Sequence, residues 1–407
     1  MIPFVALPPE FRLLLLAMRF PLSERDQSRC ADLIGSGIDW PTFAGLVAHH
    51  RVQSVASAAL DLLQKTQKTA IPQTVLDRLH AQARTNALRA VHSTGEAARV
   101  IRRFAESGFP LTLLKGVGLS QQIYANPGMR QVGDIDLLST AGNLRAQFDL
   151  LGSLGYRCTV PEARLTPRRL ASLVRFWKDA TFHSPGNTFP IELHWRLFNH
   201  RFHPANRLLD VAEFTSEPVF GFPIRVLAPA DQFLYQSAHG TADAWVYLKT
   251  LADVAGYLRI LTAEQLDAAL QKAASIGLLD HVSAAIHLAN DWMGAEISSP
   301  RLSPAESALA SFVRNRMESL LLRHDFKPSR SDPSPADWLR LELALVPGIR
   351  SKMEIVERTL NRPTLWNRIE LPDGLFWLYP LAGALLPPRR HQVQSEHAAR
   401  PAADQKR

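Results

Sequence analysis

Apolar side chains recur at helical spacing through the first hundred residues. Over 40–50, 52–63 and 74–107 they return every three to four positions, which predicts amphipathic helices. Gly108 followed by Pro110 ends this pattern, because glycine adopts the left-handed conformation that closes a helix and proline cannot continue one. We therefore predict a helical N-terminal domain over residues 1–107.

Between residues 108 and 228 the pattern changes to short apolar runs separated by turns. Strands are predicted at 111–114, 135–138, 156–160, 179–183, 189–197 and 222–227, and helices at 117–125 and 144–154. The sequence Ser184-Pro185-Gly186-Asn187 predicts a hairpin turn between the strands 179–183 and 189–197. Strands mixed with helices indicate an α/β or α+β core over 108–228.

Helical spacing returns from residue 229 and predicts a helical C-terminal domain over 229–326. Residues 327–335 are rich in Ser, Pro, Asp and Arg, so we expect 327–388 to be a linker followed by a helical extension. Residues 389–407 are polar and carry five basic against two acidic side chains. We expect this segment to be a disordered basic tail.

Composition narrows the function classes. The 407 residues suffice for two or three packed units, and the net charge of +8 is shared between the tail and a mildly basic body. This charge density does not favour nucleic acid as a partner, although it leaves that partner open. Two cysteines, Cys30 and Cys158, cannot build a disulfide framework and favour the cytoplasm. No apolar stretch approaches the ~18 residues of a membrane span, so we expect no membrane partner.

Two carboxylates lie two positions apart in Gly133-Asp134-Ile135-Asp136. On an extended strand, Asp134 and Asp136 project from the same face because side chains alternate with period two. Paired carboxylates repel each other unless a cation lies between them, and Mg²⁺ prefers oxygen ligands. The pair therefore indicates a divalent metal site, with a solvated strand end as the alternative.

Two further segments could complete such a site. Lys115-Gly116 ends a predicted strand and opens a helix, and such a turn presents backbone N–H groups and a helix N-terminus to an anion. Glu192 lies on the strand 189–197 and shares a face with His194. A glycine turn, a D-x-D pair and a third strand-borne acid form the ordered constellation of a two-metal phosphoryl-transfer site.

The motifs also occur in a recognisable order along the chain. They are Leu114-Lys115-Gly116, Tyr124, Arg130 through Leu138, Glu192-Leu193-His194-Trp195, His239-Gly240 and Trp245 through Asp253. In this order the chain resembles the nucleotidyltransferase superfamily with the DNA polymerase β-like fold, and more closely its branch of uncharacterised bacterial nucleotidyltransferases. The resemblance covers residues 38–260 and is weaker from there to 387.

This resemblance implies an α+β fold, in which a core with a small mixed sheet and helices is flanked by N- and C-terminal helical regions. It implies an NTP substrate and Mg²⁺ or Mn²⁺ bound by Asp134 and Asp136, with Glu192 as the third carboxylate that helps to deprotonate the attacking group. Gly116 would let the backbone approach the triphosphate. The superfamily has Gly-Ser or Gly-Gly at this turn, whereas this chain has Gly116-Val117, so we infer that Lys115 or Arg130 replaces the missing serine contact.

The segment 239–253 has two interpretations. In the first, Lys249 contacts the phosphates, Asp253 lies near the mouth of the active site and His239 faces the nucleotide. In the second, Lys249 and Asp253 are an i,i+4 surface ion pair worth ~0.3–0.5 kcal/mol.

The predicted reaction is metal-dependent transfer of an NMP group from an NTP to an acceptor, with release of pyrophosphate. We expect the acceptor to be a small molecule or a biosynthetic intermediate. Three alternatives remain open: a toxin-like transferase acting on RNA or protein, a nucleotide-binding scaffold without turnover, and phosphoryl transfer from the γ-phosphate, which needs similar metals.

Overall fold

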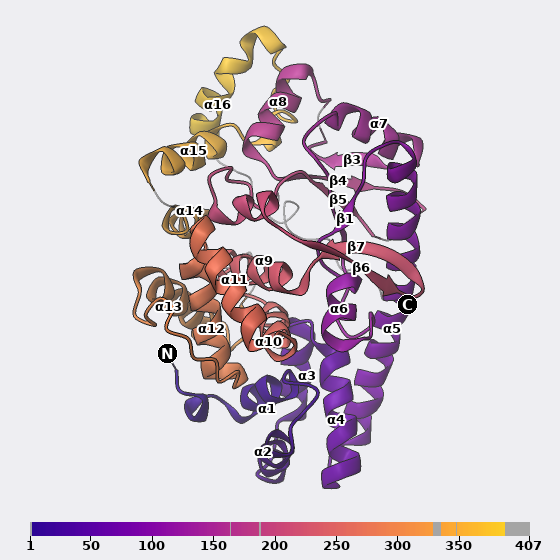
Figure 1. Ribbon diagram of the computed structural model, residues 1–407, viewed down its shortest axis with the longest axis vertical. Coiled ribbons are helices and arrows are strands. Elements are labelled where there is room, and N and C mark those ends of the chain that lie inside the picture. The colour runs from indigo at the N-terminus through magenta and orange to yellow at the C-terminus, as the bar shows by residue number, and fades with distance from the viewer. Residues whose placement is uncertain (1, 163, 187–188, 329–334, 347, 387–407) are drawn as a thin grey trace. The chain divides into compact units, whose positions relative to one another are not determined.

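The computed structural model describes residues 2–162, 164–186, 189–328, 335–346 and 348–386 (Figure 1). The chain divides into two compact units. Unit 1 consists of Met1–Gly95, Lys115–Val132 and Asp210–Asp332, and unit 2 of Glu96–Leu114, Gly133–Leu209 and Pro333–Arg407. Each unit therefore combines three separate stretches of sequence. Residues 329–334 of the predicted linker and the predicted tail at 389–407 lie outside the described residues.

Unit 1 is mainly helical. Its N-terminal stretch contains the short helix η1 (Phe4–Ala6), then α1 (Pro9–Ala17), α2 (Glu24–Gly35), α3 (Trp40–His49), α4 (Gln53–Gln67) and the greater part of α5 (Gln73–Glu106). Its other elements are α6 (Val117–Tyr124), the hairpin β6 (Phe214–Val219) and β7 (Phe222–Leu227), α9 (Pro229–Ala242), α10 (Lys249–Ile260), α11 (Ala263–Ile276), α12 (Leu279–Met293) and α13 (Ala308–Arg323). The predicted helix stop is confirmed, because α5 ends at Glu106 and Gly108 has a φ of +80°.

Aromatic side chains join distant helices in the core of unit 1. The ring of Phe11 on α1 packs edge-on against Trp292 of α12, with ring centroids 5.7 Å apart, and lies 6.0 Å from the ring of His50, which follows α3. All three side chains are buried. Burial of aromatic surface thus holds together helices that are almost three hundred residues apart in the sequence.

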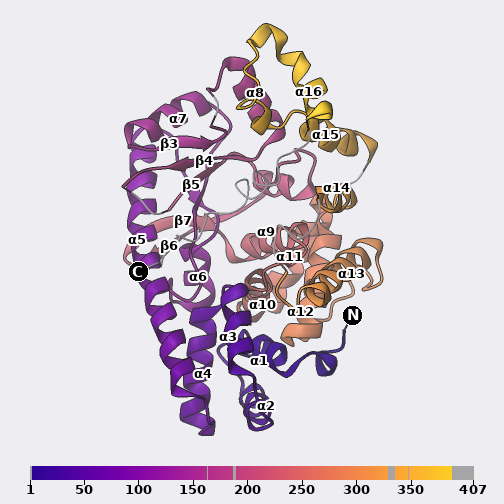
Figure 2. The ribbon, with the colours of Figure 1, turned by 180° about the vertical axis from the view of Figure 1, so that it is seen from behind.

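Unit 2 is built around a mixed sheet whose strands follow the order β3-β4-β5-β2-β1 (Figures 1 and 2). The strands are β1 (Thr112–Leu113), β2 (Ile135–Leu138), β3 (Arg157–Val160), β4 (Asp179–His183) and β5 (Ile191–His194). β2 pairs with β5 in parallel, and the other pairs of neighbours are antiparallel. The predicted hairpin is confirmed by the antiparallel pairing of β4 with β5.

Helices complete unit 2. They are α7 (Leu144–Ser153), α8 (Pro167–Phe176), the short helix η2 (Pro204–Asp210) at the edge of the unit, α14 (Pro335–Ala344), α15 (Ile349–Leu360), η3 (Pro363–Leu365), η4 (Asp373–Leu378) and α16 (Tyr379–Leu385). Both views show α7 beside β3 (Figures 1 and 2). Ile135, Leu137, Ile191 and Leu193 are buried in the central strands. The predicted α+β class, with a small mixed sheet and flanking helices, is confirmed.

Even α5, the longest described helix, contains no stretch apolar enough to traverse a bilayer, and the same holds for the other described helices.

Candidate functional site

Strand pairing in unit 2 brings two of the predicted acids side by side. Asp136 on β2 is the register partner of Glu192 on the parallel strand β5. Neighbouring strands lie only about 4.8 Å apart, so paired side chains on the same face are in contact range. The backbone fixes this arrangement at both ends, since Ile135 N donates to Pro190 O and Ser139 N donates to His194 O, with N–O distances of 3.0 and 2.8 Å.

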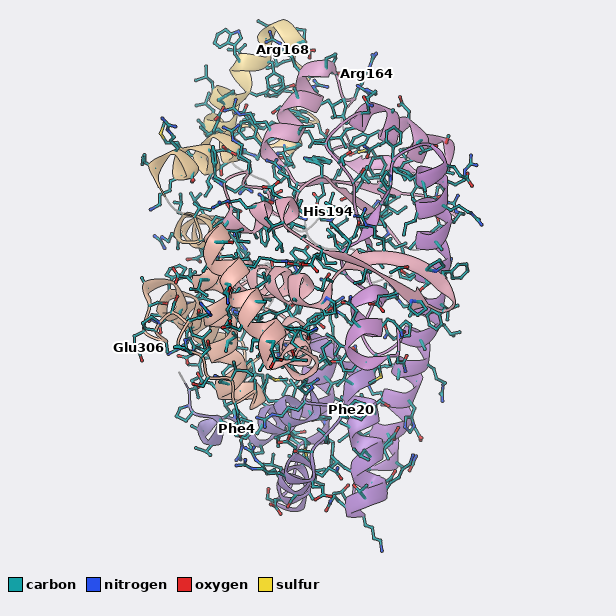
Figure 3. All side chains as sticks on the ribbon, in the orientation of Figure 1. Phe4, Phe20, Arg164, Arg168, His194 and Glu306 are labelled. Carbon is teal, nitrogen blue, oxygen red and sulfur yellow. The ribbon has the colours of Figure 1, made fainter. Side chains whose placement is uncertain are left out.

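His194, which Figure 3 labels, lies close to both carboxylates. Its Nε2 is 3.0 Å from Asp136 Oδ1 and 3.5 Å from Glu192 Oε2. The His194 side chain is fully buried, and that of Glu192 is 24% exposed, so one side of the group opens to solvent. The imidazole therefore bridges the two acids from the protein interior.

A fourth ionisable side chain, Asp179, joins the group from β4. It is the register partner of His194, and its Oδ2 lies 3.7 Å from His194 Nε2. The neighbouring Lys178 pairs with the Asp179 carboxylate. Three carboxylates and one imidazole thus meet on three adjacent strands.

The electrostatics of the group reflect this crowding. Burial raises the pKa of Glu192 above its ordinary value, and the negative charges of Asp136, Asp179 and Asp134 raise it further. Burial opposes protonation of His194, but the carboxylates of Asp136, Asp179 and Glu192 outweigh this effect and raise its pKa. The surrounding carboxylates therefore favour the protonated form of this imidazole.

The donor set suits a hard divalent cation. One ligand atom each from Asp136, Glu192 and His194 lies within 4.8 Å of the other two. Carboxylate oxygens are the ligands that Mg²⁺ and Mn²⁺ prefer, and a buried imidazole can hold such a carboxylate in place. Asp134, directly before β2, is half-buried and close enough to act on the pKa of Glu192, but it is not a member of this tightest group.

The other predicted site residues lie in unit 1, where a buried ion pair is central. Arg130 Nε donates to Asp253 Oδ2 at 2.9 Å, and both side chains are less than 10% exposed. Burial raises the pKa of Asp253, while the charges of Arg130, Lys249 and Lys115 oppose that rise. The interpretation of Asp253 as part of a surface ion pair is therefore wrong, because this carboxylate is buried on the inner face of α10 and bonded to Arg130.

An aromatic side chain connects Lys115 to His239. The ammonium of Lys115 lies 5.9 Å from the ring centre of Tyr235, and the ring of Tyr235 stacks on that of His239 with centroids 5.9 Å apart. His239 Nε2 also lies 3.5 Å from Asp243 Oδ2. Lys115, Arg130, His239, Lys249 and Asp253 therefore gather in one region of unit 1, although they span more than a hundred residues of sequence.

Two glycines in this region have a defined local role. Gly116 is the N-cap of α6 with φ +73° and ψ −127°, a conformation that L-residues with a side chain rarely adopt. Gly240 packs directly on Trp245, since a Cβ at this position would lie 2.2 Å from the indole. Ala244 and Trp245 both have positive φ, which turns the chain between α9 and α10 just before Lys249.

Sequence reasoning selected Asp136 and Glu192 but missed Asp179 and Tyr235. Counting back from the predicted turn at 184–187 places position 179 opposite Glu192 and so on the face of the acids, although the structure pairs it with His194, two positions further along the strand. Tyr235 carried no comparable signal. Its position depends on how α9 packs in unit 1, which the local pattern does not specify.

Comparison with known proteins gives the family of the chain. A family model described as "Uncharacterised nucleotidyltransferase" matches residues 36–294, which include all of the candidate residues described above. No curated protein matches the chain. Among solved structures, an antigenic nucleotidyltransferase-like protein from Paracoccidioides brasiliensis is similar over 51% of this chain and 94% of its own, with 12% identity and a TM-score of 0.31.

Proposed function

The chain belongs to this family of uncharacterised nucleotidyltransferases, and from that premise we propose that it transfers an NMP group from an NTP to a small acceptor molecule and releases pyrophosphate. The observation that carries the proposal is the register pairing of Asp136 with Glu192, with His194 Nε2 within 3.5 Å of both. A buried carboxylate such as Glu192, whose pKa is raised by burial and by neighbouring acids, is typical of a functional site.

The acids of unit 2 would hold the divalent metal, Mg²⁺ or Mn²⁺. Asp136 and Glu192 would be ligands, Asp134 would add a third carboxylate from the same face, and His194 would orient Asp136 through its Nε2. When bound, the metal neutralises these carboxylates and the phosphate oxygens and lowers the pKa of the attacking hydroxyl.

In the proposed reaction one bond to phosphorus forms and one breaks. The acceptor oxygen forms a bond to the α-phosphorus of the NTP, and the bond from that phosphorus to the oxygen bridging to the β-phosphate breaks. Pyrophosphate leaves with the electron pair, and the acceptor's proton passes to the carboxylate of Glu192, the acid of β5.

For a nucleotide bound on unit 1 we propose the following contacts. Lys115 and Lys249 supply positive charge for the phosphates, the backbone at Gly116 approaches the triphosphate from the N-terminus of α6, and His239 contacts the nucleoside. The buried ion pair of Arg130 with Asp253 would support these contacts. It holds the carboxylate of Asp253 in place, and this carboxylate interacts electrostatically with both lysines.

The test is product formation with labelled NTPs. The full chain is incubated with each NTP, Mg²⁺ or Mn²⁺ and a deproteinised bacterial extract, and adducts heavier by one NMP are sought by mass spectrometry, together with pyrophosphate. Asp136→Asn and Asp134→Asn should reduce both products, the former by at least about 100-fold.

The matched control is Asp149→Asn, which changes an exposed carboxylate on α7 of the same unit. Release of a nucleoside diphosphate in place of pyrophosphate would reassign the reaction to phosphoryl transfer. Adduct formation that is undiminished in Asp136→Asn would contradict the proposed site.

A further inference from the structure

Helix α15 of unit 2 exposes its apolar side and buries its polar side. Its outer face carries Ile349, Met353 and Val356, which are 71%, 65% and 46% exposed, whereas Glu354 and Arg358 are buried on its inner face. A surface helix of a globular protein ordinarily has the reverse arrangement, with its apolar stripe against the core. The outer face of α15 is therefore an apolar surface that the described part of the chain leaves uncovered.

Ion pairs hold α15 in this orientation. Arg201 Nε donates to Glu354 Oε2 at 2.7 Å, and the guanidinium of Arg358 pairs with Glu342 of α14. A rotation of α15 that turned its apolar side inwards would break both pairs, and a buried charge without its partner is strongly unfavourable. The apolar side is thus available to a partner that approaches from the solvent.

The outer residues of α15 have the spacing of a helix–helix interface. They follow one another at intervals of four, three and four residues, and we call them the α15 seam: Ile349, Met353, Val356 and the partly exposed Leu360. This is the pattern of alternating core positions in a coiled coil. Because the intervals read the same in both directions, an antiparallel copy of the helix would pair Ile349 with Leu360 and the two middle residues with each other.

The segments outside the described residues are poorly suited to cover the α15 seam. The two longest of them, 329–334 and 387–407, contain one large apolar side chain between them, Val393. Burial of four apolar side chains requires apolar surface on the element that covers them. This composition points to a second molecule as the partner of the α15 seam.

Charges beside the α15 seam favour a second copy of the same helix as that molecule. Arg350 and Glu357 lie seven residues apart, so they flank the seam on the same side. In an antiparallel pair related by a two-fold axis, equivalent flanks of the two helices face each other, which sets Arg350 beside Glu357 of the second copy at two contacts. Glu357 Oε2 also accepts from Arg175 of α8 at 2.8 Å, but both side chains are nearly half exposed, and a carboxylate can accept from two guanidinium groups.

The opposite orientation of the two helices is electrostatically unfavourable. In a parallel pair the first turns of both helices, each with Arg350, Lys352 and the positive end of a helix dipole, would lie side by side. In the antiparallel pair each basic first turn lies beside the C-terminal half of the other helix, which carries Glu357 and the negative end of the dipole. The charge distribution therefore selects the antiparallel arrangement.

We propose that α15 pairs antiparallel with α15 of a second copy of this chain about a two-fold axis, and that the α15 seam is the centre of this interface. Helix α16 adds to the apolar surface, because its Gly383 packs directly on the backbone of Leu360 and its Leu381 and Leu385 are exposed. Both views show α15 and α16 as neighbours (Figures 1 and 2). The pairing does not depend on the proposed nucleotidyl transfer, since α15 carries none of the residues assigned to that reaction.

The first experiment measures self-association of the full chain by sedimentation velocity at concentrations up to about 100 µM. The unmodified chain should form a dimer, and Met353→Lys should raise its dissociation constant at least about tenfold, since it places an ammonium group in the centre of the apolar contact. Leu88→Lys is the matched control, because Leu88 is 73% exposed on α5 and lies outside unit 2. A monomeric unmodified chain, or a dimer that Met353→Lys leaves unchanged, would overturn the proposal.

The second experiment tests the antiparallel register by charge exchange. Arg350→Glu brings two carboxylates together at each flanking contact and Glu357→Arg brings two guanidinium groups together, so each variant alone should weaken its dimer about fivefold at low salt. An equimolar mixture of the two variants should recover the affinity of the unmodified chain, because a mixed dimer pairs opposite charges at both contacts. Lys352→Glu is the control on the other flank, where position 352 faces Thr359, and it should change the dissociation constant by no more than about twofold.

Three results would contradict the antiparallel pair. The first is a mixture of Arg350→Glu and Glu357→Arg that associates no more tightly than either variant alone. The second is a larger effect of Lys352→Glu than of Arg350→Glu, because a parallel pair would set Lys352 rather than Arg350 beside Glu357. The third is a chain that stays monomeric but binds vesicles of phosphatidylglycerol and phosphatidylcholine through Met353, which would assign the α15 seam to a lipid surface.

Discussion

Acidification should destabilise this protein through one buried histidine, His50. The side chain is completely buried after α3, where its Nε2 donates to Phe326 O at 2.8 Å and its Nδ1 accepts from Leu248 N at 3.3 Å. These two bonds require the neutral ring with its proton on Nε2. Protonation of Nδ1 would remove the acceptor for Leu248 N and place a charge in the core.

The magnitude follows from the shift in the pKa. Burial, together with His49 and Lys327, lowers the pKa of His50 from 6.5 to about 3. Because the folded pKa is the lower one, the stability contribution is complete above 6.5 and is lost progressively as the pH falls towards 3. At about 1.36 kcal/mol per pH unit, the loss at pH 5 is about 2 kcal/mol.

The assay compares urea unfolding at pH 7 and pH 5 for the unmodified chain and for His50→Gln. Glutamine offers a donor and an acceptor but does not titrate in this range, so the variant should lose about 2 kcal/mol less between the two pH values. The control is His92→Gln, at an exposed position on α5, which should lose as much as the unmodified chain. Equal losses in His50→Gln and the unmodified chain would refute the reasoning.

Three other changes test the remaining structural arguments. Asp253→Asn removes the negative charge that the buried guanidinium of Arg130 contacts and should lower the free energy of unfolding by about 3–5 kcal/mol, measured by urea denaturation. Gly240→Ala forces a methyl group onto the Trp245 indole and should cost about 1–3 kcal/mol in the same assay, although alanine is the better helix former. Glu192→Gln should raise the melting temperature of the metal-free protein at pH 7. The pKa of Glu192 is higher in the folded than in the unfolded state, so stability is lost as the pH rises through the folded-state pKa and the carboxylate ionises, and glutamine does not ionise. This last difference should vanish near pH 4, and added Mg²⁺ should raise the melting temperature of the unmodified chain more than that of the variant.

Two matched variants accompany these changes. Asp267→Asn removes one partner of an ion pair with Arg301 in which both side chains are about half exposed, and it should cost much less than Asp253→Asn. Gly95→Ala adds a methyl group where no atom lies within 4 Å, and it should be neutral or stabilising by up to about 1 kcal/mol. If either control lowers the free energy of unfolding as much as its paired variant does, the argument from burial and close packing is contradicted.

Much of the local structure could be predicted from the sequence. Alternating and helical spacing located the strands that became β2, β4, β5 and β7 and the stop after α5, because these patterns report which side of each element is buried. The same alternation placed Asp134 with Asp136, and Glu192 with His194, on common faces. These relations hold over a few residues and depend only on backbone geometry.

Which faces meet is decided by the tertiary structure. The parallel register of β2 with β5 is what sets Asp136 beside Glu192, and the register of β4 adds Asp179, which local reasoning passed over. The strand pattern allowed either neighbour and either direction, because hydrogen bonds of the backbone are the same for every sequence.

The charges of buried groups depend on the fold even more strongly. Asp253 and Lys249 satisfy the spacing of a surface pair, yet Asp253 is paired with Arg130, which lies 123 residues earlier in the chain. His50 is completely buried after α3, and this burial lowers its pKa to about 3. The sequence by itself thus determined which residue types lie on each strand and helix. Burial and long-range pairing depend on the tertiary structure, and they set the local dielectric and the partner of each charged group. They therefore decided how those residues are ionised and what they can bind.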